Sequence, residues 1–134
     1  MGVGLVPDTA VYFYKDDDGT VPVLDWLKKL RRENRKAHAY CVARIRLLAE
    51  MGHELRRPHA DYLREGVYEL RTRGGRVNYR VPYFFHGRDV AVLAHGSTEE
   101  DKVPDTDIER AIQRKKRYEQ DPDGHRYLED TSDG

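Results

Sequence analysis

The sequence predicts an α+β domain, because helical and strand-like hydrophobic patterns occupy separate segments of the chain. Residues 20–52 carry apolar side chains at helical spacing. Residues 67–95 contain three runs of strand-forming residues, and Gly74-Gly75 lies between the first two. A last helical pattern begins at Pro104. A block of helices followed by a block of strands is typical of α+β domains. We therefore expect a compact antiparallel sheet with an N-terminal helical hairpin on one face and a C-terminal helix.

The helical hairpin is predicted from two amphipathic stripes. In the first helix, Thr20 is the expected N-cap and Pro22 lies in the first turn. The second helix should stop at Gly52, because glycine readily adopts the left-handed conformation that ends many helices. The apolar stripes consist of Val23, Leu24, Leu27 and Leu30 in the first helix, and of Ala37, Cys41, Ile45 and Leu48 in the second.

The strands are expected at 11–14, 67–73, 76–85 and 90–95. Pro82 is unusual in the third of these, since proline cannot donate a hydrogen bond to a neighbouring strand. We expect a bulge or an edge position there. In the last helix, Thr106-x-x-Glu109 is a candidate capping box.

The 134 residues fit a single domain, which we place at residues 1–120. Residues 121–134 are polar and acidic and are expected to fray. The lone Cys41 excludes an intramolecular disulfide. No apolar stretch is long enough to cross a membrane, and the N-terminus lacks the basic residues of a signal peptide. These features favour a cytoplasmic protein with no membrane partner.

The formal net charge is zero, but its distribution is uneven. Residues 28–90 hold sixteen basic and seven acidic side chains, whereas the flanking segments are acidic. This central block could attract phosphate groups. A solvated surface balanced by the acidic ends explains the same distribution, so charge alone leaves both readings open.

The hairpins predict which side chains share a face of the sheet. With Gly74-Gly75 as a two-residue turn, Arg71 opposes Asn78 and Leu70 opposes Tyr79. A second turn at His86-Gly87 pairs Asn78 with His95 and adds the imidazole to the polar face. The apolar face should pack on the helical hairpin, and the polar face should stay open. The polar face carries Glu69, Arg71, Arg73, Arg76, Asn78, Arg80 and His95.

This polar face is either an ordinary solvated side of a sheet or an anion-binding site. Four arginines against one glutamate favour an anion, because their mutual repulsion needs relief. RNA can be cleaved without a metal when its 2′-hydroxyl attacks the adjacent phosphate. Arginine stabilises the charge that develops, and histidine transfers protons near neutral pH. No metal-ligand spacing or cofactor motif is present, so we expect neither a metal nor a cofactor.

Several motifs in residues 63–104 strongly resemble the HigB-like, phage-derived branch of the RelE/ParE toxins. The resemblance extends over roughly residues 10–120. It is carried by Tyr68-Glu69-Leu70-Arg71, Tyr79-Arg80, Tyr83-Phe84-Phe85, Leu93-Ala94-His95-Gly96, Val23-Leu24-x-Trp26-Leu27 and Ile108-Glu109-Arg110-Ala111.

This resemblance implies a compact RelE-like domain that acts as a ribosome-dependent mRNA endoribonuclease. It also implies an antitoxin partner, typically a helix-turn-helix protein, in addition to the ribosome and mRNA. By position, Arg71, Arg80 and His95 match the residues that such toxins use. Lys102 completes the catalytic set that we expect, and Arg73, Arg76 and Asn78 are expected to bind RNA.

The segment after His95 departs from the family pattern of a phenylalanine followed by two lysines. It reads Ser97-Thr98-Glu99-Glu100-Asp101, and only Lys102 is retained. The acidic residues should repel RNA and raise the pKa of His95. Two alternatives therefore stay open. One is a non-nuclease toxin that binds a protein target such as gyrase, and the other is a degenerate toxin that retains only antitoxin binding.

Overall fold

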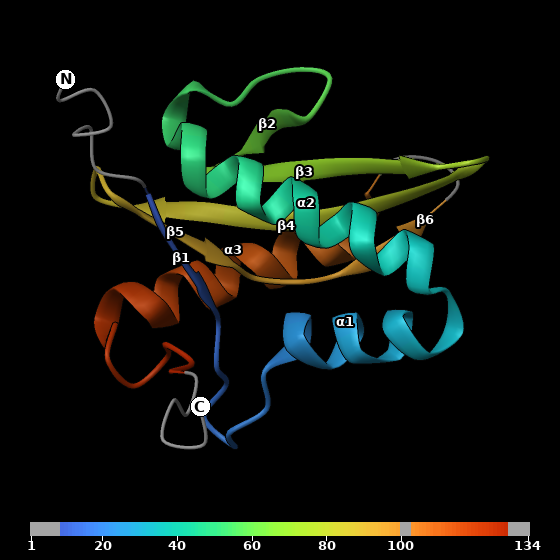
Figure 1. The fold of residues 1–134 in the computed structure, drawn as a ribbon. Helices are drawn as coiled ribbons and strands as arrows, with labels where there is room; N and C mark the ends of the chain where they lie inside the picture. Colours follow the sequence, from blue (N-terminus) through green and yellow to red (C-terminus); the bar gives the residue numbers. More distant parts are fainter. Residues whose placement is uncertain (1–8, 100–102, 129–134) are drawn as a thin grey trace, which may run out of the picture.

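The computed structural model describes residues 9–99, without the Glu99 side chain, and residues 103–128. Its sheet has the strand order β1-β5-β4-β3-β2, and β6 pairs with β4 beyond the end of β5. The elements in chain order (Figure 1) are β1 (Ala10–Phe13), α1 (Pro22–Glu33), α2 (Arg35–Met51), the short 3-10 helix η1 (Gly52–Glu54), β2 (Ala60–Arg64), β3 (Val67–Gly74), β4 (Val77–His86), β5 (Val90–Leu93), β6 (Ser97–Glu99) and α3 (Asp105–Gln120).

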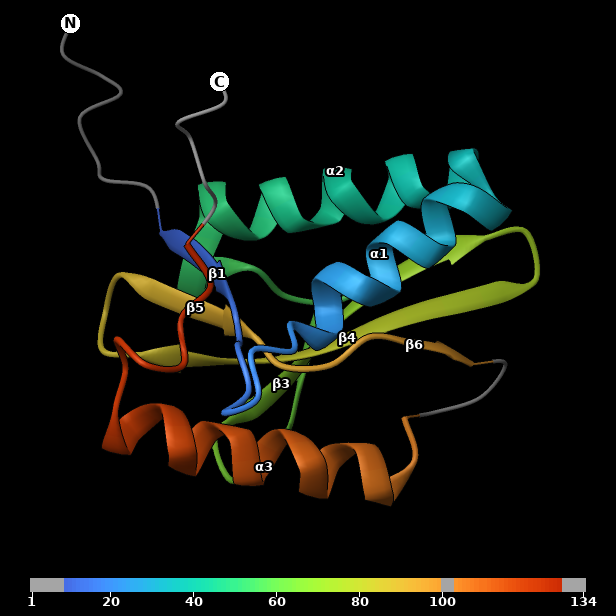
Figure 2. The same cartoon turned by 90° about the horizontal axis from the view of Figure 1, so that it is seen from below.

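The elements form three layers. Figure 2 shows α1 and α2 on one face of the sheet and α3 on the opposite face. The predicted α+β class and the N-terminal helical hairpin are confirmed. The sheet is mixed, because β1 runs parallel to β5 while β2, β3, β4 and β6 pair in antiparallel fashion. No helix among the described residues is long and apolar enough to span a membrane.

The helix boundaries follow from local chemistry. Pro22 opens α1, but the capping position is Val21 and no side chain caps this end, so the prediction for Thr20 is wrong. Asn34 caps α2, because its side chain accepts a hydrogen bond of 3.1 Å from the amide of Ala37. Gly52 ends α2 with a φ of 54°, as predicted.

The C-terminal helix differs from its prediction at the N-terminus. Helix α3 begins at Asp105 after Pro104, and no side-chain hydrogen bond caps it. The predicted capping box of Thr106 and Glu109 is therefore wrong. Glu109 instead forms an ion pair of 2.9 Å with Arg64 of β2.

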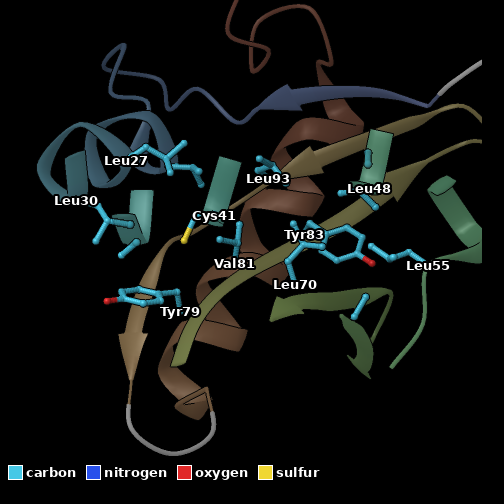
Figure 3. Close-up of a cluster of buried hydrophobic side chains, with 14 residues drawn as sticks. Leu27, Leu30, Cys41, Leu48, Leu55, Leu70, Tyr79, Val81, Tyr83 and Leu93 are labelled. Carbon is cyan, nitrogen blue, oxygen red and sulfur yellow. The ribbon is translucent and has the colours of Figure 1, made fainter. Parts of the chain in front are cut away.

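Two apolar cores lie on the two faces of the sheet. The first lies between the sheet and the pair α1–α2 and includes Leu48, Leu70 and Tyr83 (Figure 3). The second lies between the sheet and α3 and is built around Phe84 and Tyr118. Because both faces are covered, the sheet is not the one-sided sheet that the sequence predicts.

The first hairpin turns one residue later than predicted. Its turn residues are Gly75 and Arg76, and only Gly75 has a positive φ, as in a type II′ turn. The pairing therefore shifts by two residues, so that Arg71 opposes Arg80 and Leu70 opposes Val81. A shift of two residues preserves the faces, and the predicted grouping of side chains on β3 and β4 is correct.

The strand register of the second hairpin differs from the predicted register by an odd number of residues. Tyr83 opposes Leu93, and Phe84 opposes Val92. The side chains of β5 are thereby exchanged between the faces: Leu93 faces the helical hairpin, while Val92 faces α3. The predicted pairing of Asn78 with His95 is wrong, because Asn78 opposes Glu99.

Pro82 lies in the central strand β4, beside the break between β5 and β6. The amide of Ala94 donates a hydrogen bond of 2.9 Å to the carbonyl of Pro82. The nitrogen and carbonyl of one residue point to the same side of a strand, so the missing N–H lies where the ladder is interrupted. The irregularity that we expected at Pro82 is therefore present, but it is the break between β5 and β6 rather than a bulge in β4.

Residues 121–128 lie along the outer edge of β1. The amide of Tyr127 donates to the carbonyl of Phe13, and the amide of Lys15 donates to the carbonyl of His125, both at 2.9 Å. The expectation of a frayed tail is therefore wrong for these residues, and residues 129–134 lie outside the described part of the chain.

Candidate active site

The arginine cluster consists of Arg57, Asp61, Glu69, Arg71 and Arg80, on β2, β3, β4 and the loop before β2. Arg71 and Arg80 are directly opposed across the β3–β4 ladder. Glu69 lies two residues before Arg71 and therefore shares its face. Its Oε1 accepts hydrogen bonds from Arg71 Nε at 2.7 Å and from Arg80 Nη1 at 2.8 Å. One buried carboxylate thus bridges the two arginines.

A second carboxylate holds the other end of Arg71. Asp61 Oδ2 accepts from Arg71 Nη2 at 3.3 Å and from Arg57 Nη2 at 2.8 Å. The hydrogen bond from Arg57 is the main reason that the pKa of Asp61 lies below its usual value. Since three arginines meet two carboxylates, the cluster has one net positive charge. The repulsion that we expected an external anion to relieve is therefore relieved largely within the protein.

Exposure within the cluster decreases from Arg71 to Glu69. The side chain of Arg71 is 37% exposed, that of Arg80 is 13% exposed and that of Glu69 is 2% exposed. Arg80 is therefore not on an open surface, contrary to the sequence-based expectation. Two buried atoms, Glu69 Oε2 and Arg80 Nε, have no hydrogen-bond partner among the described residues. The cluster is accessible mainly through Arg57, which is 74% exposed, and Arg71, while the unpaired atoms of Glu69 and Arg80 are buried.

His95 lies at the edge of the sheet between β5 and β6, where its side chain contacts α3. Its Nε2 is 3.3 Å from Asp107 Oδ1, and its Nδ1 is 3.4 Å from Arg114 Nη1. Arg114 Nη1 also donates to the carbonyl of Ala94 at 2.7 Å. Because arginine can only donate, Nδ1 must be the unprotonated nitrogen, and Nε2 carries the proton toward Asp107.

This environment favours neutral His95. Burial lowers the pKa of His95 below 6.5, and this effect outweighs the opposing effect of Asp107. The nearby guanidinium of Arg114 lowers the pKa of His95 further. The expected rise in the pKa is therefore wrong. Glu100 and Asp101, to which we attributed it, lie outside the described residues, as does the Glu99 side chain.

A pocket of about 480 Å³ opens beside His95. Gly96 lies against the indole of Trp26 so closely that a Cβ atom on Gly96 would lie 2.4 Å from Trp26 Cδ2. Glycine is therefore required for this contact between the β5–β6 connection and α1. The pocket is lined by Trp26, Lys29, Leu30, Glu33, His95, Gly96, Ser97, Thr98 and Asp107.

The other expected site residues do not join the cluster. Arg73 and Arg76 are exposed at the tip of the β3–β4 hairpin, and Arg73 Nε donates to the carbonyl of Gly75 at 3.1 Å. Asn78 is half-buried and pairs with β6. Lys102 lies outside the described residues. Within the described ranges, no group of His, Cys, Asp and Glu side chains could hold a metal ion.

A separate basic surface lies on α1 and at the start of α2. These side chains are exposed and border a shallow depression of about 450 Å³. None of them forms an ion pair with another described residue, whereas the arginines of the cluster do. The basic surface consists of Lys28, Arg31, Arg32 and Arg35.

Sequence reasoning missed four residues that shape the site, one of which is Arg57, the partner of Asp61. Asp61, Asp107 and Arg114 reach Arg71 and His95 from β2 and α3. Each is an ordinary charged residue in its own segment. Only the packing of α3 and β2 against the central strands brings them to the site, so no local pattern could have identified them.

Comparison with known proteins gives a family match over residues 25–116, to the family described as Phage derived protein Gp49-like (DUF891). This segment is more than half of the chain. A search of the curated proteins found no significant match. The chain therefore belongs to the Gp49-like phage-derived family, which is part of the RelE/ParE-like toxin superfamily and is associated with the toxins of toxin–antitoxin systems.

Proposed function

We propose that this protein is a HigB-like toxin that cleaves mRNA on the ribosome. The arginine cluster carries the proposal. Arg71 and Arg80 lie directly opposite each other on the adjacent strands β3 and β4, and the cluster keeps one net positive charge after its internal pairing. A phosphate that becomes more negative during cleavage is a suitable partner for two adjacent guanidinium groups.

The reaction needs no metal. The 2′-hydroxyl of the RNA loses its proton and attacks the neighbouring phosphorus, a cyclic phosphate forms as the bond from phosphorus to the 5′-oxygen breaks, and the leaving 5′-oxygen takes a proton from water. Arg71 and Arg80 stabilise the charge on the phosphate oxygens. His95 is suited to accept the proton of the 2′-hydroxyl, because a lowered pKa keeps it neutral at neutral pH. To accept this proton, the unprotonated Nδ1 of His95 must break only its long contact of 3.4 Å with Arg114.

The basic surface on α1 supports an RNA partner. Its side chains are exposed and have no acidic partner among the described residues, so they could contact phosphate groups of ribosomal RNA without breaking an internal ion pair. The family's association with toxin–antitoxin systems implies an antitoxin. We propose that this antitoxin is a helix-turn-helix protein.

One observation favours a second candidate. Glu69 and Asp61 already neutralise most of the charge on the arginines, which weakens the cluster as an RNA site. A non-nuclease toxin that binds a protein target such as gyrase would not need a strongly positive site. A degenerate toxin that only binds its antitoxin is the further alternative.

Expression in a bacterial host separates these candidates. An active toxin should stop growth on induction, and co-expression of the product of an adjacent helix-turn-helix gene should restore it. Cells that express Arg80→Lys should grow normally if RNA cleavage causes the growth arrest, because lysine lacks the forked donors of arginine. Toxicity that persists in Arg80→Lys would favour the protein-binding alternative. Normal growth with confirmed accumulation of the wild-type protein would contradict an active toxin.

A further inference from the structure

We propose that Glu69 is a positioning residue, whose carboxylate holds the guanidinium groups of Arg71 and Arg80 in the arrangement that binds one phosphate. This inference rests on the proposed function, because it assigns a role within the same site. Glu69 does not contact the RNA in this proposal. It acts through the two arginines.

The first argument comes from the register of the sheet. Directly opposed residues on antiparallel strands have Cβ atoms only about 5 Å apart, and like charges in such pairs repel. Arg71 and Arg80 are such a pair. Glu69 Oε1 accepts from both of them, at 2.7 and 2.8 Å. Without this shared acceptor, the two guanidinium groups would move apart, and a single phosphate could no longer meet both.

The second argument comes from burial. Glu69 is 2% exposed, in a strand whose other buried positions are apolar or Thr72. A buried ion pair is often no more stabilising than apolar side chains of the same size. Stability alone therefore does not explain a carboxylate at this position. A requirement for two cations at a fixed separation does explain it.

The third argument comes from the donors that remain. Arg71 uses Nε toward Glu69 and Nη2 toward Asp61, so two of its nitrogens are fixed and Nη1 makes no hydrogen bond to the described residues. Arg80 uses Nη1 toward Glu69, and its Nε has no partner in the described part of the chain. Arg71 thus keeps Nη1 available for a ligand, whereas Arg80 is held through Nη1 and its Nε is buried.

Two other roles for Glu69 make different predictions. If Glu69 only joined β3 to β4, its loss would lower stability, and the folded fraction would keep normal activity. If Glu69 competed with the phosphate, its loss would strengthen substrate binding and leave kcat unchanged. A positioning role instead predicts a lower kcat in the folded protein.

The test uses the full chain with Glu69→Gln and Glu69→Ala, and with Glu65→Gln as the matched control. Glu65 is an exposed carboxylate on the β2–β3 turn that pairs with Arg64, outside the cluster. The amide oxygen of glutamine can still accept from the arginines, so Glu69→Gln keeps part of the geometry and should fold even if Glu69→Ala does not. Thermal denaturation of each variant gives the temperature at which all of them are folded.

At that temperature, cleavage of mRNA on ribosomes is measured over a range of ribosome concentrations. We expect kcat to fall by about tenfold in Glu69→Gln and about a hundredfold in Glu69→Ala, with KM changed by less than about threefold, because misplacing a group by about 1 Å can cost about a hundredfold. Glu65→Gln should match the wild type. A wild-type kcat in folded Glu69→Gln and Glu69→Ala would overturn the proposal, and so would a lower KM with unchanged kcat.

A second readout does not depend on cleavage. Inorganic phosphate is titrated into protein labelled with ¹⁵N-arginine, and the Nε–H signals of Arg71 and Arg80 are followed. In the wild type both signals should move with one common affinity, and in Glu69→Gln they should move separately or more weakly. If the wild type cuts no mRNA, the proposed function fails, but this titration still tests Glu69. Identical titrations of the wild type and Glu69→Gln would overturn the positioning role.

Discussion

Replacing Gly96 with alanine should destabilise the protein, because the new methyl group would collide with Trp26. The Cβ would lie 2.4 to 2.6 Å from three atoms of the indole, Cδ2, Cε3 and Cγ. These are rigid ring atoms, so helix α1 or the β5–β6 connection must shift. Overpacking of this kind typically costs about 1–3 kcal/mol. For a domain of this size, that cost corresponds to a decrease in Tm of about 3–10 °C.

The matched control is Gly74→Ala. Gly74 also lacks a positive φ, but its Cβ would lie 3.2 Å from Tyr79 Cε2, a contact that a few tenths of an ångström relieve. Both changes restrict the unfolded chain equally, which contributes about 0.4–1 kcal/mol of stabilisation in each variant. The difference in Tm between the two variants therefore isolates the collision with Trp26, and it should be several degrees.

A double variant tests the cause. In a Trp26→Ala background the space beside Gly96 is empty, so adding Gly96→Ala should leave Tm unchanged or raise it slightly. Thermal denaturation followed by circular dichroism measures all four proteins. An equal loss of Tm with and without Trp26 would show that Gly96 does not pack on the indole.

Three further predictions concern the core and the edge of the sheet. Burial raises the pKa of the Cys41 thiol to about 11, so a thiol-reactive dye should label Cys41 only after denaturant is added, and rapid labelling of the native protein would contradict its burial. Leu48 is fully buried, and Leu48→Ala should lower the free energy of unfolding by about 2–5 kcal/mol, whereas Met51→Ala, at an exposed position of the same helix, should change it little; urea denaturation measures both. The pKa of His95 lies below its unfolded value of 6.5, so the unfolded state takes up the proton first and stability should fall as the pH drops below about 6.5; this loss should be smaller in His95→Gln, and parallel Tm–pH curves between pH 5 and 8 would contradict it.

The sequence predicted those features that local patterns determine. Helix α2 ends at Gly52 because glycine tolerates the φ of 54° found there. The faces of β3 and β4 were predicted correctly despite the displaced turn, because apolar and polar side chains alternate along both strands. Leu70 and Arg71 therefore lie on the expected faces.

Strand β5 could not be oriented in the same way. Val90, Ala91, Val92 and Leu93 are all apolar, so no polar position shows which side faces outward. The second core beneath α3 buries Val92 and thereby decides the register. The same packing brings the His95 side chain to Asp107 of α3. Contacts of this kind depend on distant segments, which the local sequence does not specify.

Primer extension on a defined mRNA, translated in a reconstituted system with the purified protein, tests RNA cleavage by the arginine cluster most directly. The wild type should produce cuts within the coding region only when ribosomes are present. In Arg71→Ala and Arg80→Lys the cuts should weaken by about 10²–10³, the usual effect of removing a group that stabilises a charged transition state. Absence of cuts with folded wild-type protein, or cuts of undiminished strength in both variants, would contradict cleavage by this cluster.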